Sequence, residues 1–215
     1  MVFLTLGTSK PLCCKESKGI RMNILETKVY GIEPAIQGMR NPLKSWEKSD
    51  SIGDVIGEKD LILAKKLIRG GSEHRKFLRQ IFVTMYIEAP MYWFAEFDTY
   101  KVGTTRNSTS FMHTGLKEPF KLEHFAHSED TLLWNMALDN LNELRDKYLE
   151  DKDPDIFNQL RSLLPSGYIY GSSISMNYEN VVNILGQRRF HKLPEWQIFC
   201  DKLEELPYIK EFLSI

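Results

Sequence analysis

The sequence predicts one domain that combines helices with a small number of strands, of the α/β or α+β class. The chain has 215 residues, a length typical of a single large domain. Hydrophobic residues make up 42% of it and charged residues 27%, which provides enough apolar material for a core. Segments with helical spacing of apolar residues alternate with shorter segments that have the composition of strands.

The N-terminal boundary of the domain is expected at Met22, where the first strand pattern begins. We therefore expect residues 1–21 to be a loose extension and residues 22–215 to form the domain. The apolar run at residues 2–6 is too short for the hydrophobic region of a signal peptide, and no stretch approaches the length of a membrane span. Neither secretion nor membrane binding is expected.

Charge and cysteine content restrict the class of partner and the compartment. The net charge of -1 argues against a nucleic-acid binder that neutralises many phosphates, although a small anion needs only a few local cations. The three cysteines, Cys13, Cys14 and Cys200, form neither a disulfide framework nor a zinc motif. These features favour a cytoplasmic protein, with Cys200 as a buried structural thiol among apolar neighbours.

The first half of the domain is expected to hold two strands and two helices. Apolar spacing predicts one helix that ends at a Gly pair, and an aromatic-rich segment after Pro90 is expected to be a buried helix of the core. The expected elements are a strand over 22–30, a polar connection over 33–51 that includes Trp46, a helix over 60–69, a strand over 82–87, the aromatic helix over 92–100 and a loop over 103–110.

The second half is expected to be mainly helical. The clearest helix covers 129–150, where one face is expected to carry Leu133, Met136, Ala137, Leu141, Leu144 and Tyr148. A helix over 155–164 stops before Pro165, and a strand follows over 168–175. Asn177 is a good N-cap for a helix that reaches Arg188, and Pro194 opens a last helix.

Two segments have residue types suited to binding an anion. Arg161 precedes Leu-Pro on a helix, and Arg188 lies two elements later, so a helix–strand–helix unit can bring both guanidinium groups to one pocket. In isolation each arginine is equally compatible with a solvated helix face. The second segment, 100–110, combines Gly103 and several hydroxyl residues with Lys101 and Arg106, which suits a phosphate-binding loop or a simple polar turn.

Taken in order, these segments resemble the flavin-dependent thymidylate synthases, the ThyX family. That family carries Arg-His-Arg-x-x-Ser-x-Asn-x-x-Ser-x-Arg-Tyr, then Arg-x-x-Leu-Pro, a strand, an Asn that opens a helix, a helical Leu-Arg and a tail such as Ala-Gln-Trp-Glu-Ile-Arg. The resemblance covers about residues 60 to 200. The matching residues are Glu73-His74 before the strand, Asn107 and Ser110, Arg161 to Pro165, Asn177, Arg188, and the tail Pro194 to Phe199.

The resemblance implies a fold and roles for these residues. The fold would be a small, mainly antiparallel sheet flanked by long helices. Arg161, Arg188, Ser110 and Asn107 would contact dUMP, with Arg188 and Ser110 nearest the chemistry and Arg189 as a possible substitute for Arg188. The residues implied at the FAD site are His74, Asn177, Asn183 and Lys101.

The resemblance also implies an activity, the reductive methylation of dUMP at C5. Methylenetetrahydrofolate would give the carbon, reduced FAD the hydride and NADPH the electrons, in a homotetramer whose active sites lie at subunit interfaces. The family uses no cysteine nucleophile, in agreement with this sequence. We therefore expect an enzyme.

The family triplet is rewritten here as Tyr100-Lys101-Val102, and the later Arg-Tyr reads Met112-His113. These changes remove guanidinium groups. Lys101 restores one positive charge but not the forked set of N–H donors that an arginine offers. Two alternatives therefore stay open: an enzyme of the same fold that modifies another pyrimidine nucleotide, and a non-catalytic nucleotide-binding or interaction protein that has lost flavin.

A metal site is not expected. His124 and His127 are spaced as neighbours on a helix, with Glu123 and Glu129 close by in the sequence. Such pairs are more often ordinary surface or core residues than ligands.

Overall fold

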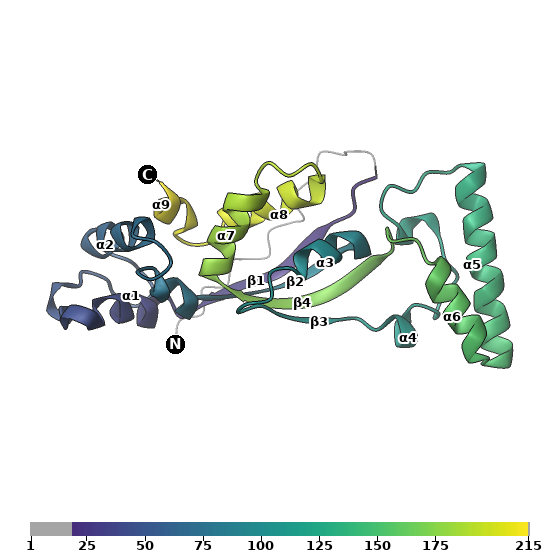
Figure 1. The fold of residues 1–215 in the computed structure, drawn as a ribbon, viewed down its shortest axis with the longest axis horizontal. Helices are drawn as coiled ribbons and strands as arrows, with labels where there is room; N and C mark the ends of the chain where they lie inside the picture. Colours follow the sequence, from purple (N-terminus) through teal and green to yellow (C-terminus); the bar gives the residue numbers. More distant parts are fainter. Residues whose placement is uncertain (1–18, 215) are drawn as a thin grey trace.

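The computed structural model of the protein describes residues 19–214 and contains one antiparallel sheet with the strand order β1-β2-β4-β3. In Figure 1, α3, α7 and α8 lie over one face of this sheet, α1 and α2 lie at one end of it, and α5 with α6 lies at the other end. The strands are β1 (Asn23–Tyr30), β2 (Phe82–Pro90), β3 (Thr105–Ser108) and β4 (Ile169–Asn177). The expectation of a small antiparallel sheet flanked by helices is confirmed.

The α-helices differ widely in length, and α5 is the longest of them. They are α1 (Ile32–Arg40), α2 (Glu58–Arg69), α3 (Met91–Phe97), α4 (Phe111–Thr114), α5 (Leu132–Asp151), α6 (Pro154–Leu163), α7 (Tyr178–Arg188), α8 (Pro194–Glu204) and α9 (Ile209–Leu213). Short 3-10 helices are η1 (Asn41–Leu43), η2 (Trp46–Lys48), η3 (Lys76–Gln80) and η4 (Leu122–His124). Among the helices of residues 19–214, none combines the length and apolar character that crossing a bilayer requires.

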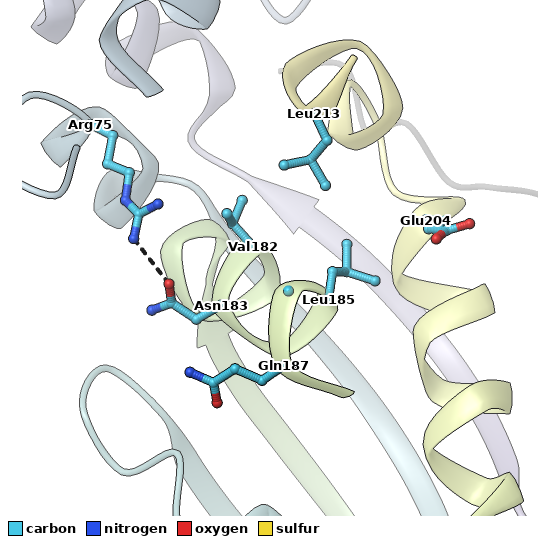
Figure 2. A pocket seen from close by; sticks show the side chains of 8 residues that line it. Arg75, Val182, Asn183, Leu185, Gln187, Glu204 and Leu213 are labelled. Carbon is cyan, nitrogen blue, oxygen red and sulfur yellow. Dashed lines mark hydrogen bonds between the residues drawn. The ribbon is translucent and has the colours of Figure 1, made fainter. Parts of the chain in front are cut away.

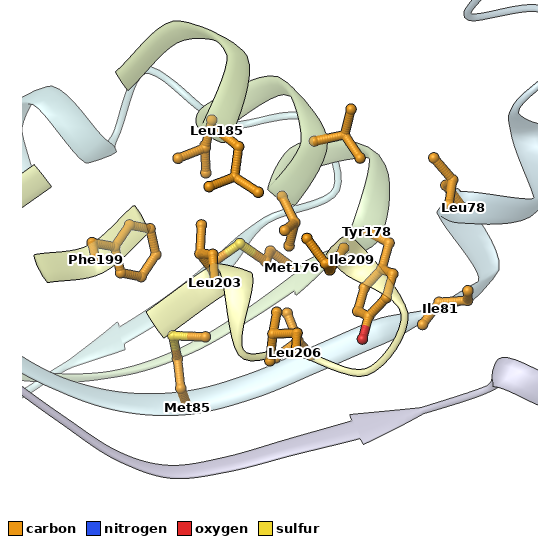
Figure 3. Close-up of a cluster of buried hydrophobic side chains, with 14 of the residues drawn as sticks. Leu78, Ile81, Met85, Met176, Tyr178, Leu185, Phe199, Leu203, Leu206 and Ile209 are labelled. Carbon is orange, nitrogen blue, oxygen red and sulfur yellow. The ribbon is translucent and has the colours of Figure 1, made fainter. Parts of the chain in front are cut away.

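Alternating side chains of the central strands build the main core. On β2 every second residue from Val83 to Ala89 is buried, and Ile174 and Met176 of the neighbouring β4 face the same way. Helices α3, α7, α8 and α9 cover this face, and Figure 3 shows the side chains that interlock there. The expected role of the aromatic segment is confirmed, because Trp93, Phe94 and Phe97 of α3 are buried in the main core.

A second, smaller core lies beneath α5 and α6. Its buried members are Phe111, Leu116, Phe120, Phe125, Leu141, Phe157 and Leu160. Tyr170 at the start of β4 packs against both the main core and this small core. The small core therefore meets the main core at the beginning of the strand that crosses the molecule.

Three expectations about elements were wrong. Residues 33–51 were expected to be a connection, but they hold α1, because Ile32, Ala35, Ile36 and Met39 recur at helical spacing and are buried. The 103–110 segment was expected to be a loop, but β3 lies within it, because polar residues suffice on an edge strand that pairs only with β4. Leu133 and Met136 were expected on the same apolar face of α5 as Leu141, but they are 79% and 53% exposed, because the buried side of α5 is centred on Leu141.

A buried ion pair holds the loop that follows α1. Asp60 of α2 is 0% exposed, and one of its carboxylate oxygens accepts a hydrogen bond from Arg40 Nε at 2.5 Å. Its other carboxylate oxygen accepts hydrogen bonds from the hydroxyl groups of Ser49 and Ser51. Burial opposes ionisation of Asp60, but these hydrogen bonds outweigh it and lower the pKa of the carboxyl group. The loop is thereby attached to the first turn of α2.

The expected N-terminal extension lies largely outside the residues that the structure describes. The described part begins at Gly19, whose carbonyl accepts a hydrogen bond from the His127 amide at 2.6 Å. Met22 is buried directly before β1 begins.

Candidate functional site

Strand β4 links the two regions in which the candidate residues gather. Arg161 belongs to α6, which precedes β4, whereas Asn177, Asn183 and Arg188 belong to the N-cap and body of α7, which follows it. The first region surrounds Tyr170 at the start of β4. The second lies along α7 and the C-terminal end of α3.

In the first region, Ser110 and Arg161 both lie near Tyr170. The Thr109 amide donates to the Gly171 carbonyl at 2.8 Å, which extends the β3–β4 pairing past Ser108 and Ser172. The next position along the two chains brings Ser110 beside Tyr170. Arg161 stacks over Phe157 of the small core at 5.9 Å, and Tyr170 packs against that same core.

Arg161 is the candidate arginine whose guanidinium group has no ion-pair partner among residues 19–214. It is exposed and makes no hydrogen bond or ion pair with any residue between 19 and 214. Burial raises the pKa of the Tyr170 phenol, and the positive charges of Arg161 and Arg106 partly oppose that rise. The tyrosine hydroxyl therefore lies in the field of two guanidinium groups.

Arg106 is the second of these cations, and its position is fixed. It forms a two-point ion pair with Asp98 at 2.9 and 2.7 Å, and its guanidinium lies 4.8 Å above the Phe94 ring. Its remaining nitrogen approaches Ser172 Oγ at 3.5 Å. Asn107, the next residue of β3, is exposed and pairs with Ser173, so it alternates to the opposite face of the sheet from Arg106.

The second region is built around Arg188 at the end of α7. Its Nη1 lies 3.0 Å from Glu96 Oε2, its Nε donates to the Tyr100 hydroxyl at 2.9 Å, and its guanidinium lies 4.8 Å over the Trp196 ring. Trp196 Nε1 donates to the same Glu96 oxygen at 2.8 Å, and His191 Nε2 lies 3.6 Å from it. Within residues 19–214, Arg188 is therefore held by a carboxylate and Arg161 is not, and different side chains surround the two arginines.

The rewritten triplet belongs to this second region. Tyr100 bonds Arg188 and also donates to Gln187 Oε1 at 3.0 Å. The Val102 carbonyl accepts a hydrogen bond from Asn180 Nδ2 of α7 at 2.7 Å. Lys101, between them, is exposed. The loop that carries the triplet is thus fixed to α7 at two points.

Gly103 explains how closely this loop approaches α7. It has a φ of 74°, and a Cβ atom at this position would lie 2.3 Å from Asn177 Nδ2. Asn177 is the N-cap of α7, as expected, and accepts a hydrogen bond from the Asn180 amide at 3.0 Å. The carbonyl oxygen of its side chain is thereby used within the helix cap, while its amide group faces the loop.

A groove of about 500 Å³ runs along the outer side of α7. Figure 2 shows Arg75, Asn183 and Gln187 along one side of it, with Arg75 Nη2 donating to Asn183 Oδ1 at 3.0 Å. Further N–H groups of all three side chains make no hydrogen bond within residues 19–214. The groove is completed by Val182, Leu185, Gly186, Glu204 and Leu213.

Two further residues expected at the site lie near its edge. His74 is exposed, precedes the N-cap Arg75 of η3 and lies against Gly70. Arg189 is ion-paired with Asp201 and with Glu204 of α8, the latter at 3.1 Å. Arg189 is therefore engaged on α8 rather than beside Arg188.

The histidines considered as metal ligands have separate surroundings. His124 Nδ1 accepts a hydrogen bond from the Lys121 amide, and His127 Nε2 lies 3.5 Å from the buried carboxylate of Glu195. Within residues 19–214, no three His, Cys, Asp or Glu side chains are grouped to hold a metal ion. Cys200 is buried, as expected, and burial raises the pKa of its thiol to about 11.

Comparisons with known proteins identify the fold. Neither the models of protein families nor the curated proteins give a match to this sequence. A crystal structure of thymidylate synthase X (ThyX) from Helicobacter pylori with FAD and dUMP superposes with a TM-score of 0.69 and 21% identity, over 90% of this chain and 97% of that one. The fold is that of ThyX. The UMP/dUMP methylase PolB from Streptomyces cacaoi, bound with 5-Br dUMP, has a TM-score of 0.59 and 14% identity over 86% of this chain and 89% of its own.

Within this ThyX-like fold, several residues that sequence reasoning did not single out complete the two regions. Glu96 lies one helical turn before Tyr100, and Arg75 and Gln187 are direct neighbours of candidate residues. Tyr170 carried no signal of its own, and Arg106, expected as a cation of the 100–110 segment, meets it only through the pairing of β3 with β4.

Proposed function

We propose that the chain is a diverged ThyX family member that binds a pyrimidine nucleotide, dUMP in the first place, and methylates it reductively at C5. The observation that carries this proposal is the open guanidinium of Arg161 beside Ser110 and Tyr170, in a chain with the fold of ThyX. A guanidinium without a carboxylate partner is suited to a phosphate group. Asn107 would contribute from the opposite face of β3.

The groove on α7 fits the proposed FAD cofactor. Arg75, Asn183 and Gln187 present free N–H donors along one side of it, which suits the diphosphate or the ring carbonyls of a flavin nucleotide. His74 and Lys101 would add contacts at its rim, and Asn177 at the helix N-terminus. Reduced FAD would supply the hydride, with methylenetetrahydrofolate as the carbon donor and NADPH as the reductant.

Arg188 would lie next to the pyrimidine ring and polarise it, while Ser110 and Arg161 fix the nucleotide. Arg188 is well ordered for this role, since Tyr100, Trp196 and Glu96 hold its guanidinium from three directions. Cys200, the cysteine within residues 19–214, is not proposed as a nucleophile, because it is buried and its thiol is protonated at neutral pH.

We propose a homotetramer, in which one subunit completes the site of another. Arg161 and Arg188 have different neighbours within one chain, and a shared nucleotide would then contact Arg161 of one subunit and Arg188 of the next. Exposed apolar residues on α5, Leu132, Leu133 and Met136, offer a surface for this association.

The ion pair between Arg188 and Glu96 favours one alternative, an enzyme of the same fold that acts on another pyrimidine nucleotide. A neutralised Arg188 is less able to stabilise negative charge on uracil. A protein that binds a nucleotide without flavin chemistry is the second alternative, consistent with the loss of the Arg-His-Arg triplet at Tyr100-Lys101-Val102.

Three measurements separate these possibilities. A flavin absorption spectrum, together with NADPH oxidation that dUMP accelerates, would support the thymidylate synthase reaction. Protein that is colourless and does not take up added FAD contradicts it. Arg161→Ala should abolish the thermal shift with dUMP, whereas Arg69→Ala, an exposed arginine at the end of α2, should leave it unchanged.

A further inference from the structure

Tyr170 is the tyrosine on which the two cores and the candidate nucleotide residues converge. Its ring packs against the main core and the small core, while its hydroxyl makes no hydrogen bond to any residue from 19 to 214. A phenol that is half buried usually finds a polar partner. The Tyr170 hydroxyl is not among the buried polar atoms that lack a partner, so solvent reaches it and a ligand can bond to it.

The neighbours of this hydroxyl define the chemistry of that partner. Tyr170 shares its face of β4 with Ser172, which Arg106 approaches, and it lies beside Ser110 in the extended β3–β4 pairing. Arg161 reaches the same place from α6, over Phe157. The start of β4 therefore places the Tyr170 hydroxyl near Ser110 and in the field of Arg161 and Arg106.

We propose that Tyr170 is a further substrate-binding residue, whose hydroxyl donates a hydrogen bond to the phosphate group of the nucleotide. The inference rests on the proposed function, to which it adds a residue and a specificity for the phosphorylated form. Arg161 supplies the open charge, while Arg106, paired with Asp98, is a fixed neighbour beside Ser172. A nucleoside without phosphate gains nothing from this group of side chains.

Tyr168 provides a matched control two residues earlier. Its ring also packs against the small core, and its phenol is similarly half buried. Burial, Tyr170 and Glu118 all raise the pKa of its phenol, however, and no arginine opposes that rise as Arg161 does for Tyr170. Tyr168→Phe therefore removes a similar hydroxyl group at a position where no contact with the phosphate is expected.

The test compares Tyr170→Phe, Tyr168→Phe and Arg161→Ala with the wild-type full chain, using calorimetric titration with dUMP and with deoxyuridine. We expect Tyr170→Phe to weaken dUMP binding about tenfold and to leave deoxyuridine binding unchanged, as for loss of one hydrogen bond to a charged group. Tyr168→Phe should bind both ligands as the wild type does.

The outcomes distinguish this inference from the function on which it rests. Wild-type protein that binds no pyrimidine nucleotide overturns both. Wild-type binding that Arg161→Ala weakens and Tyr170→Phe does not leaves the proposed function intact and overturns the role of Tyr170. The role of Tyr170 is also overturned if Tyr170→Phe weakens the binding of dUMP and of deoxyuridine equally, or if Tyr168→Phe weakens dUMP binding as much as Tyr170→Phe does. Thermal melting of each variant confirms that the ring, which phenylalanine retains, still packs.

Discussion

Glu96 controls how much charge Arg188 can offer to a ligand. Its carboxylate lies 3.0 Å from Arg188 Nη1, and two unit charges at that distance attract by about 5 kcal/mol at an effective dielectric constant of about 20. The side chains are 20% and 35% exposed, so solvent screening reduces the net value to about 1–2 kcal/mol. An anionic nucleotide at Arg188 must compete with this attraction.

Glu96→Gln removes the negative charge and keeps an oxygen that accepts from Arg188 and from Trp196. We expect dUMP affinity to rise about five- to tenfold, equivalent to about 1–1.4 kcal/mol, with a small loss of thermal stability. Calorimetric titration at two salt concentrations measures the effect, and the gain should shrink at higher salt. Glu150→Gln, an exposed carboxylate at the end of α5, controls for the change in net charge.

An unchanged or weaker affinity of Glu96→Gln for dUMP would refute this reasoning. It would mean that Arg188 works as part of a neutral pair, or that the nucleotide does not reach it.

Three further predictions concern stability and assembly. Because the pKa of Asp60 is lowered in the folded state, its ionised carboxylate contributes to stability in full above the ordinary carboxyl pKa of the unfolded chain. This stability is lost as the pH falls through the lower pKa of the folded state. Asp60→Asn should therefore cost about 3 kcal/mol in urea unfolding at pH 7 and flatten the acid side of the stability profile; equal losses at pH 7 and in strong acid would contradict this. Gly103→Ala should cost about 1–2 kcal/mol, read as a lower Tm, because of its positive φ and the clash with Asn177, and an unchanged Tm would show that the loop shifts freely. Leu133→Glu should reduce the mass in solution measured by light scattering without lowering Tm, and an unchanged tetramer would exclude this surface of α5.

Local patterns in the sequence predicted most of the elements, because they depend on neighbours along the chain. The cap at Asn177, the Gly pair after α2 and the alternation of β4 each follow from nearby residues. Helix α1 was missed because a proline and polar residues interrupt a short amphipathic segment. Strand β3 was missed because an edge strand of polar residues owes its existence to β4, far away in the sequence.

Individual residues of the candidate site could be predicted from the sequence, but the ion pairs of its arginines could not. Arg161, Ser110 and Arg188 were identified through their resemblance to family motifs. Glu96 holds Arg188 and Asp98 holds Arg106, whereas Arg161 has no carboxylate partner in the described part of the chain. These differences depend on tertiary contacts that the spacing of residues does not reveal. These pairings decide which cation is available to a ligand.

The two separate cores imply that the molecule opens in stages. The small core has seven buried residues, and among residues 19–214 Tyr170 is the residue that packs against both cores. The lobe formed by α5 and α6 is therefore expected to exchange its amide protons through partial unfolding, while β2 and β4 stay protected until the whole chain unfolds. A nucleotide held between Arg161 and Tyr170 would slow that partial opening, so amide exchange in α6 offers a readout of binding that needs no turnover.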